Sequence, residues 1–173
     1  MWKKVLEVYP RHNVNHTSEF SDKGLVKVGT SLNEKEIREL LTEEKTGWLA
    51  TVSPEKRPHL IPIHFGFFDG KVHVVFVHKS SKSLRYIQNN SSICFGVNVG
   101  EKEGEIKCVL ILGKGGVVDD NVAFTNAYLK ILTKYLSSKD EAEAFFQKLT
   151  SSQAIAKRTL VVIKPEKTIS WKL

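Results

Sequence analysis

The sequence contains no long apolar run and few cysteines. Its apolar stretches span only a handful of residues, as at 108–112, and no apolar segment follows Met1. A transmembrane helix needs about 20 consecutive apolar residues, and a secretory signal needs an apolar core. We therefore expect a soluble cytoplasmic protein with no membrane partner. The two cysteines, Cys94 and Cys108, lie in apolar runs and form neither a disulfide framework nor a metal-binding spacing.

Long blocks of like charge are also missing, although the formal net charge is +7. A basic balance is typical of proteins that bind nucleic acid, anionic lipid or acidic ligands. Here lysine and arginine alternate with glutamate, as in residues 33–38, and no basic block of five or six residues occurs. This pattern is typical of a solvated surface of mixed charge. We therefore expect no nucleic-acid partner.

The chain divides into a short arm and one domain. Residues 1–30 carry turn formers and only brief apolar pieces, so we expect an arm that packs onto the domain or onto a partner subunit. Residues 31–173 are long enough for one domain with its own core. At its start, Ser31 and Glu34 have capping-box spacing. Apolar residues then recur at helical intervals, which predicts a helix that ends near Thr46-Gly47.

Short strands joined by turns follow this helix. We expect strands at 48–52, 57–68, 71–77, 93–99, 105–118, 159–163 and 168–171, the last two separated by a break at 164–166. A helix is expected at 80–90, and two amphipathic helices precede residue 159. The first half lacks the crossover helices of a parallel sheet. The pattern predicts a mainly β, α+β fold, namely an antiparallel barrel of six to eight strands with peripheral helices.

The predicted hairpin at Asp69-Gly70 brings two cations together. With a two-residue loop, Phe68 faces Lys71, and the same register carried to the open end puts Arg57 opposite Lys82. Like charges directly opposed across a ladder destabilise it, and an anion between them would remove that cost. Hydroxyl groups and the start of the next helix add further donors there, from Ser80, Ser81 and Ser83.

Two alternatives remain open for this hairpin. Arg57 and Lys82 are equally compatible with two solvated cations beside a polar turn. Pro62 lies inside the second strand, which implies an edge or a bulge that would shift the register. Pro62 also withholds one ladder donor, so the backbone of residues 60–65 has groups free for a flat heteroaromatic ligand. An ordinary edge strand is the alternative.

Five stretches carry a family resemblance: GWLATV at 47–52, RPHLIPIHF at 57–65, DGKVHV at 69–74, HKSSKSL at 78–84 and SICF at 92–95. In this order and spacing they resemble the FMN-binding split barrels related to pyridoxamine 5'-phosphate oxidase. The resemblance implies a split barrel that binds FMN at the interface of a homodimer. It implies phosphate contacts from Arg57, Ser81 and Lys82, to which the hairpin argument adds Ser80. It places the isoalloxazine ring along Ile61, Pro62, Ile63 and His64, with Phe76 and Val77 on the facing strand.

The function expected from this resemblance is that of an FMN-dependent oxidoreductase acting on a small organic substrate. No residue pair stands out as catalytic acid and base, and in flavin enzymes the cofactor carries the redox chemistry. Among late residues, Lys157, Arg158 and Trp171 are candidates for completing the site. A flavin carrier or sensor without turnover, a deazaflavin-binding relative and a haem-binding relative are the alternatives. Two histidine pairs on the hairpin, His64 with His73 and His59 with His78, lack the further ligands of a metal site.

Overall fold

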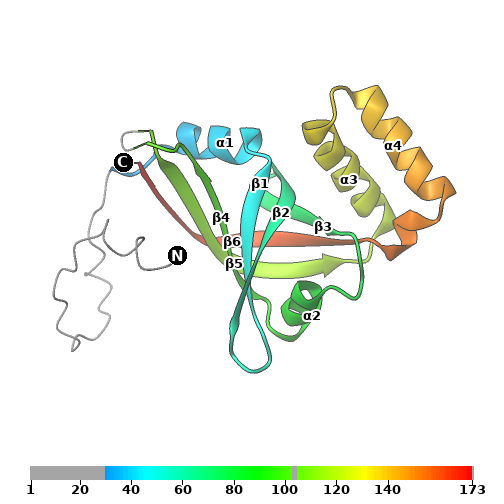
Figure 1. The fold of residues 1–173 in the computed structure, drawn as a ribbon, viewed down its shortest axis with the longest axis horizontal. Helices are drawn as coiled ribbons and strands as arrows, with labels where there is room; N and C mark the ends of the chain where they lie inside the picture. The colour runs from blue at the N-terminus through cyan, green and yellow to red at the C-terminus, as the bar shows by residue number, and fades with distance from the viewer. Residues whose placement is uncertain (1–29, 103–104, 173) are drawn as a thin grey trace, which may run out of the picture.

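The computed structural model of the protein describes residues 30–102 and 105–172, so the predicted arm lies outside it except for Thr30. Within the described residues, six antiparallel strands close into a barrel in the order β1-β2-β3-β6-β5-β4 (Figure 1). The strands are β1 (Thr46–Val52), β2 (Pro58–Phe68), β3 (Lys71–Phe76), β4 (Ser92–Val99), β5 (Lys107–Val118) and β6 (Thr159–Lys172). The predicted fold class is confirmed, with the lower of the expected strand numbers.

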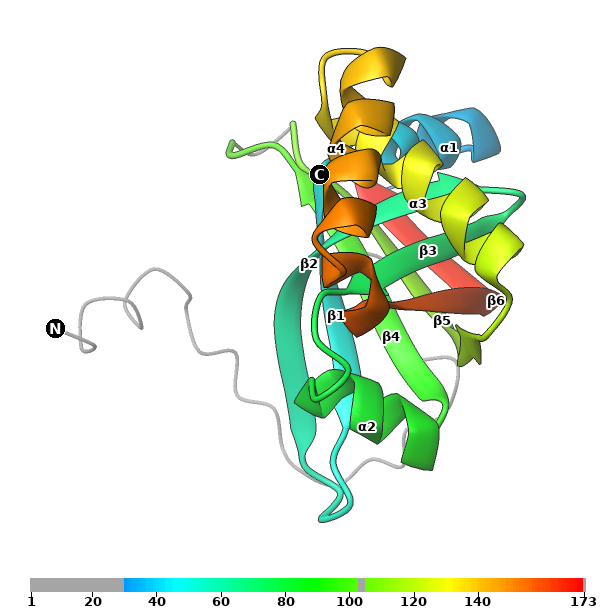
Figure 2. The same cartoon turned by 90° about the vertical axis from the view of Figure 1, so that its right-hand side faces the viewer.

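Four α-helices and a short 3-10 helix surround the barrel in the described part of the chain. They are α1 (Glu34–Glu43), α2 (Lys82–Asn89), α3 (Asn121–Tyr135), α4 (Lys139–Ser151) and η2 (Ala154–Lys157). Helices α1 and α2 lie at opposite ends of the barrel, while α3 and α4 lie side by side on its outside (Figures 1 and 2). Among these helices, none is both long enough and apolar enough to cross a membrane.

The barrel interior forms the main core. Alternate side chains of the strands point inward, as the period of a β-strand requires, and the largest fully buried residues include Phe65, Phe95 and Ile111. Helices α1 and α2 contribute further apolar side chains to this core, namely Leu40, Leu41, Leu84 and Ile87. A second, smaller core lies between α3 and α4, around Tyr128, Ile131, Leu132, Ala142 and Leu149. Helical periodicity predicts Leu84 and Ile87 as inward residues of α2 and Phe145 as an inward residue of α4; the first two are confirmed, and the last is wrong because Phe145 is exposed.

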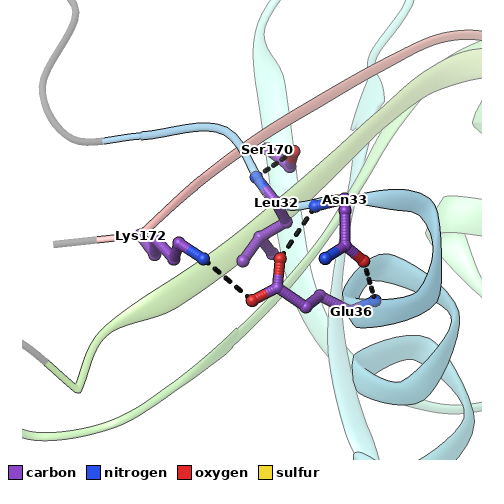
Figure 3. A network of polar contacts seen from close by, with 5 residues as sticks. All are labelled: Leu32, Asn33, Glu36, Ser170 and Lys172. Atoms are coloured by element: carbon purple, nitrogen blue, oxygen red, sulfur yellow. Dashed lines mark hydrogen bonds and ion pairs between the residues drawn. The ribbon is translucent and has the colours of Figure 1, made fainter.

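The cap of α1 differs from the prediction. Asn33, not Ser31, is the N-cap: its side chain accepts from the amide of Glu36, and the Glu36 carboxylate accepts from the amide of Asn33 (Figure 3). Ser31 lies outside the helix because the next residue, Leu32, is buried and donates its amide to Ser170 Oγ at 3.2 Å. The Asn33 amide, followed by the ammonium of Lys172 at 2.9 Å, lowers the pKa of Glu36 below its ordinary value.

The predicted break near Pro165 is also wrong, because β6 is one continuous strand. Strand β6 pairs with β5 from Leu160 to Lys172, and the register shifts between Leu112 and Gly113, so that one extra residue of β6 is absorbed as a bulge. Proline is tolerated in strands at bulges, where no ladder donor is lost. Gly113 is required here, since a Cβ at this position would lie 2.2 Å from the carbonyl oxygen of Lys164.

Candidate functional site

Strand β2 changes partner partway along its length. Residues 58–64 pair with β1, and residues 65–68 pair with β3. An antiparallel strand directs its N–H and C=O groups to both of its edges, so residues 58–64 have a second edge. Among residues 30–102 and 105–172, no strand pairs with that second edge. Its backbone groups are available to water or to a ligand, as the position of Pro62 suggested.

The predicted hairpin register is correct close to the turn and wrong farther away. Phe68 faces Lys71 and Phe65 faces Val74, as expected, but the ladder between β2 and β3 ends there. Arg57 therefore does not oppose Lys82 across this ladder. Beyond Phe65 and Val74 the two strands separate: β1 pairs with the opposite edge of β2, and β3 continues in its ladder with β6.

A tyrosine of α3 holds β2 at the residue where its partner changes. The hydroxyl of Tyr135 accepts from the amide of Phe65 at 2.7 Å and lies 3.0 Å from the carbonyl oxygen of the same residue. The same hydroxyl also donates to the carbonyl of Lys45, just before β1. One side chain thus bonds to both strands where β2 turns from β1 to β3. The sequence pattern does not predict this role, because it identifies Tyr135 only as one of several residues on the apolar face of a helix.

The surroundings of Tyr135 are aromatic and cationic. The imidazole ring of His64 stacks on the Tyr135 ring with centroids 4.4 Å apart. Lys134 Nζ lies 3.7 Å from the centroid of Phe65 and donates to the carbonyl of Leu41 at 3.2 Å. Burial lowers the pKa of Lys134 to about 8. Burial also raises the pKa of Tyr135, partly offset by its hydrogen bond with Phe65. His64 is thus held against α3 at the end of the free strand edge.

The N-terminus of α2 has the features of an anion site. Its N-cap, Ser81, makes no side-chain capping bond, and no acidic residue lies in the first turn. The other described α-helices are capped by the side chains of Asn33, Asp120 and Ser138. The first N–H groups of α2 and the positive end of its dipole are therefore free to bind an anion. Lys82 begins the helix and is exposed, which adds a positive charge.

Arg57 reaches this end of the barrel through the turn between β1 and β2. Its amide donates to Ser53 Oγ at 3.2 Å, and its carbonyl accepts from the amide of Ser53 at 2.9 Å. The tip of the β1–β2 hairpin and α2 lie at the same end of the barrel (Figures 1 and 2). The ring of Tyr86 on α2 packs edge-on against His59 of β2, with centroids 5.5 Å apart. Helix packing, rather than strand pairing, brings the two predicted phosphate segments to one region.

The other predicted cofactor residues divide by exposure. Along β2, Ile61 and Ile63 are half-buried and pack against the core, whereas Pro62 and His64 are exposed. Val77 is 48% exposed after the end of β3. Phe76 is 4% exposed and belongs to the barrel core. Only the backbone of Phe76 is therefore left for a ligand, because its side chain is occupied by packing.

The histidines of the hairpin have other partners. His73 is buried and stacks on Phe68 with centroids 3.7 Å apart. Burial lowers the pKa of His73 to about 4, with a weaker opposing contribution from the Lys71 carbonyl. No group of three or more metal-ligating side chains occurs in the part of the chain that the structure describes. His73 is thus a neutral, packed residue of the β3 ladder.

The outside of the barrel carries apolar side chains that pair across neighbouring strands. Directly opposed residues point to the same side of a sheet, and the register opposes Trp48 to Pro62 and Cys94 to Leu112, with Ala50 between Leu60 and Cys94. We define these six residues as the outer apolar face. Leu60 is 58% exposed and Trp48 is 44% exposed. Contiguous apolar surface of this kind marks interaction sites.

Within the described residues, the fold and these features define an antiparallel split barrel with a free edge on β2 and an α2 start that has no side-chain cap. The profile of the pyridoxamine 5'-phosphate oxidase family matches residues 33–172. The chain belongs to this family, which confirms the resemblance drawn from the sequence. The family is of the flavin-binding oxidoreductase type. No curated protein sequence matches the chain.

Solved structures share the fold at low sequence identity. A conserved hypothetical protein from Mycobacterium tuberculosis has 22% identity and a TM-score of 0.73, over 84% of this chain and 88% of that chain. An FAD-binding protein from Mesorhizobium loti has 17% identity and a TM-score of 0.59, over 82% and 93%. An F420 reductase has 20% identity and a TM-score of 0.55, over 76% and 94%. These likenesses establish the fold of the chain.

Proposed function

We propose that this protein is an FMN-dependent oxidoreductase that acts on a small organic substrate, with the flavin bound at a homodimer interface. The observation that carries the proposal is the free edge of residues 58–64 at the same end of the barrel as the uncapped start of α2. A flavin has a ring system with hydrogen-bonding groups at one end and a phosphate at the other. Both kinds of group find matching partners in these two segments.

The phosphate is the part for which the fit is most specific. Free N–H groups at a helix N-terminus bind phosphate well, and the hydroxyl of Ser81 is not used as a cap. Ser80, Lys82 and Arg57 add a hydroxyl and two positive charges that are exposed at this end of the barrel. Charge-assisted hydrogen bonds of this type are about twice as strong as neutral ones.

The ring would lie along the backbone of Ile61, Pro62, Ile63 and His64, with Phe76 and Val77 contributing backbone groups from β3. The bound flavin would supply the redox chemistry. The protein's own residues orient the ring: the β2 edge offers N–H and C=O partners, and Tyr135 fixes the end of that edge at Phe65. His64 is stacked on Tyr135 and bounds the site on the side of α3.

A second copy of this chain would cover the outer apolar face. Leu60 and Pro62 belong both to this face and to the strand that we propose binds the flavin. A homodimer formed through this face would therefore place the partner subunit beside the ring and exclude water from it. It would also explain why Trp48 and Leu60 are exposed in the single chain.

A deazaflavin coenzyme is the second candidate, because an F420 reductase has the same fold. Purified protein should be titrated separately with FMN and with the deazaflavin, and each bound cofactor should then be tested for reduction by a nicotinamide nucleotide. FMN binding with rapid, saturable bleaching supports the proposal. FMN binding without bleaching indicates a carrier or sensor. If the protein does not bind FMN, the proposed function is wrong.

The phosphate assignment has a matched pair of variants. Lys82 and Lys139 are both exposed and each begins a helix, but only α2 lacks a side-chain cap. We expect Lys82→Glu to weaken FMN binding by at least about tenfold, the size of one charge-assisted hydrogen bond, and Lys139→Glu to leave it unchanged. Fluorescence titration of FMN measures both. Equal affinities for the two variants would refute this assignment.

A further inference from the structure

A cavity lies beside the proposed phosphate site and has no part in the function proposed above. It has a volume of about 470 Å³ and is formed by α3, α4, η2 and the loop that follows β3. This size is within the range of small-molecule sites, roughly 300–1,000 Å³. Lys79 lines the cavity and is followed directly by Ser80. The cavity is therefore next to the segment that we expect to hold the flavin phosphate.

Three kinds of side chain in the lining of this cavity are suited to a nucleotide. Two aromatic rings, Phe124 of α3 and Phe146 of α4, form part of its wall, and both are half-buried. Two cations, Lys79 and Arg158, contribute positive charge. Asp119 and Asp120, with Asn121, provide oxygen acceptors at the start of α3. Aromatic rings stack on bases, cations bind phosphate and a carboxylate accepts from ribose hydroxyls.

Arg158 is held in place with donors to spare. Its Nε donates to the hydroxyl of Tyr128 at 3.1 Å, and its Nη1 donates to the carbonyl of Ala154 at 2.5 Å. A guanidinium has five N–H donors, so three are not used by these two bonds. Among the ion pairs of the described residues, none involves Arg158. A half-buried guanidinium held by neutral partners beside a cavity attracts an anion.

We propose that this cavity binds an adenine nucleotide moiety, with the base against the rings of Phe124 and Phe146 and the phosphate near Arg158 and Lys79. This inference rests on the proposed function, because it takes the flavin phosphate to be bound next to the cavity, at Ser80, Ser81 and Lys82. Two sources supply this chemistry. One is the adenylate half of FAD, continuing from the flavin phosphate, and the other is a separate adenine nucleotide such as the adenylate half of a nicotinamide dinucleotide.

Two binding measurements distinguish these sources. The first compares the affinities of the purified protein for FMN and FAD, by quenching of flavin fluorescence. The second measures binding of AMP by calorimetry, to the flavin-free protein and to the FMN-loaded protein. FAD binding at least about tenfold tighter than FMN binding, the size of one stacked base, supports the inference and identifies FAD as the source. Equal flavin affinities together with AMP binding support a separate nucleotide.

Neighbouring residues provide the control variants. Phe146→Ala should remove the preference for FAD, or the binding of AMP, whereas Phe145→Ala on the exposed side of α4 should not. Lys79→Gln should have the same effect as Phe146→Ala, while Lys148→Gln, at an exposed lysine of α4 outside the cavity, should have none. Lys79 is an exposed loop residue, so its variant tests the inference without loss of core packing.

One result overturns this inference and leaves the proposed function intact. If FMN and FAD bind equally and AMP does not bind, the cavity does not take an adenine nucleotide, although the proposed flavin site stands. If neither flavin binds, the proposed function fails, and AMP binding to the flavin-free protein still decides the inference. AMP binding that is unchanged in both Phe146→Ala and Lys79→Gln would place the nucleotide elsewhere and also overturn it.

Discussion

Residues 58–64 and residues 65–68 form one continuous strand, yet their surroundings differ. The first segment alternates between exposed and half-buried residues and pairs with β1 on one edge, and no strand of the described part of the chain pairs with its other edge. The second segment begins with Phe65, which is fully buried, pairs with β3 and is held by Tyr135. The second segment is enclosed by the fold. The first retains free backbone groups and exposed apolar side chains.

Because of this difference, we expect the second segment of β2 to contribute mainly to stability and the first mainly to ligand binding or assembly. Substitutions in the second segment should lower the free energy of unfolding, because they disturb the core or its hydrogen bonds. Substitutions in the first segment should change ligand binding or assembly and leave the stability of the single chain nearly unchanged. The predictions below test that separation.

The largest effect on the free energy of unfolding is expected from a substitution of Phe65. Its side chain is fully buried and packs edge-on against Phe95, with centroids 4.8 Å apart. Phe65→Ala should lower the free energy of unfolding by about 3–5 kcal/mol, because it removes buried area and leaves a cavity. Urea denaturation followed by circular dichroism measures the change. Leu60→Ala in the first segment, at a side chain 58% exposed, should cost far less, and similar losses would contradict the separation.

The next largest effect on the free energy of unfolding depends on pH and comes from a histidine in the ladder between β2 and β3. His73 faces Gly66, and burial lowers its pKa from 6.5 to about 4. The unfolded chain binds a proton near pH 6.5 and the folded chain does not, so stability is unaffected above that pH and falls as pH decreases from 6.5 to 4. The loss is on the order of 3 kcal/mol at pH 4.

Urea midpoints between pH 7.5 and pH 4 measure this dependence. His73→Phe should reduce it, because the substituted residue does not titrate. A dependence that is equally steep in the variant would show that His73 does not cause it.

A smaller effect is expected at the residue that joins the two segments. Tyr135→Phe removes the hydroxyl that bonds to the amide of Phe65 and to the carbonyl of Lys45. Leaving such groups without partners costs about 1–3 kcal/mol. The variant should lose stability by this amount and should also show faster amide exchange at Phe65, measured by NMR. Unchanged exchange at Phe65 would contradict the role that we assign to Tyr135.

The smallest effect on the stability of the single chain is expected on the outer apolar face. Leu60→Asp should convert a dimer to a monomer, because a carboxylate would be buried without a partner in the interface. Light scattering measures the mass. Val122→Asp is the matched control, since Val122 is 70% exposed on α3 and lies outside this face. A dimer that persists in Leu60→Asp would place the interface elsewhere.

Local sequence signals predicted most of the fold. The turn at Asp69-Gly70 fixed the register of the residues next to it, and helical periodicity identified most buried residues of the helices, with Phe145 as an exception. The errors occurred where two local choices were equally compatible with the chain. Ser31 and Asn33 are both good N-cap residues, and only the burial of Leu32 decides between them. Pro165 was interpreted as a break because the bulge that accommodates it depends on β5.

The site was less predictable, for a physical reason. The ladder between β2 and β3 ends at Phe65 and Val74, beyond which β3 continues in its ladder with β6, and no pattern within β2 reveals that end. Tyr135 bonds to a residue that lies 70 positions away in the chain. Nothing in the sequence indicates whether a tyrosine at this position packs in the core or forms hydrogen bonds through its hydroxyl. The helix expected at 80–90 is confirmed as α2, whereas anion binding at its N-terminus stays a prediction, and its position relative to Arg57 depends on how α2 packs.

The central claim is that the free edge of β2 and the start of α2 bind a flavin. The most direct test is the visible absorption spectrum of the protein, as purified and after incubation with FMN followed by desalting. We predict flavin absorption that stays with the protein, at about one flavin per chain, and that is lost in Lys82→Glu. A colourless protein after both steps would contradict the claim.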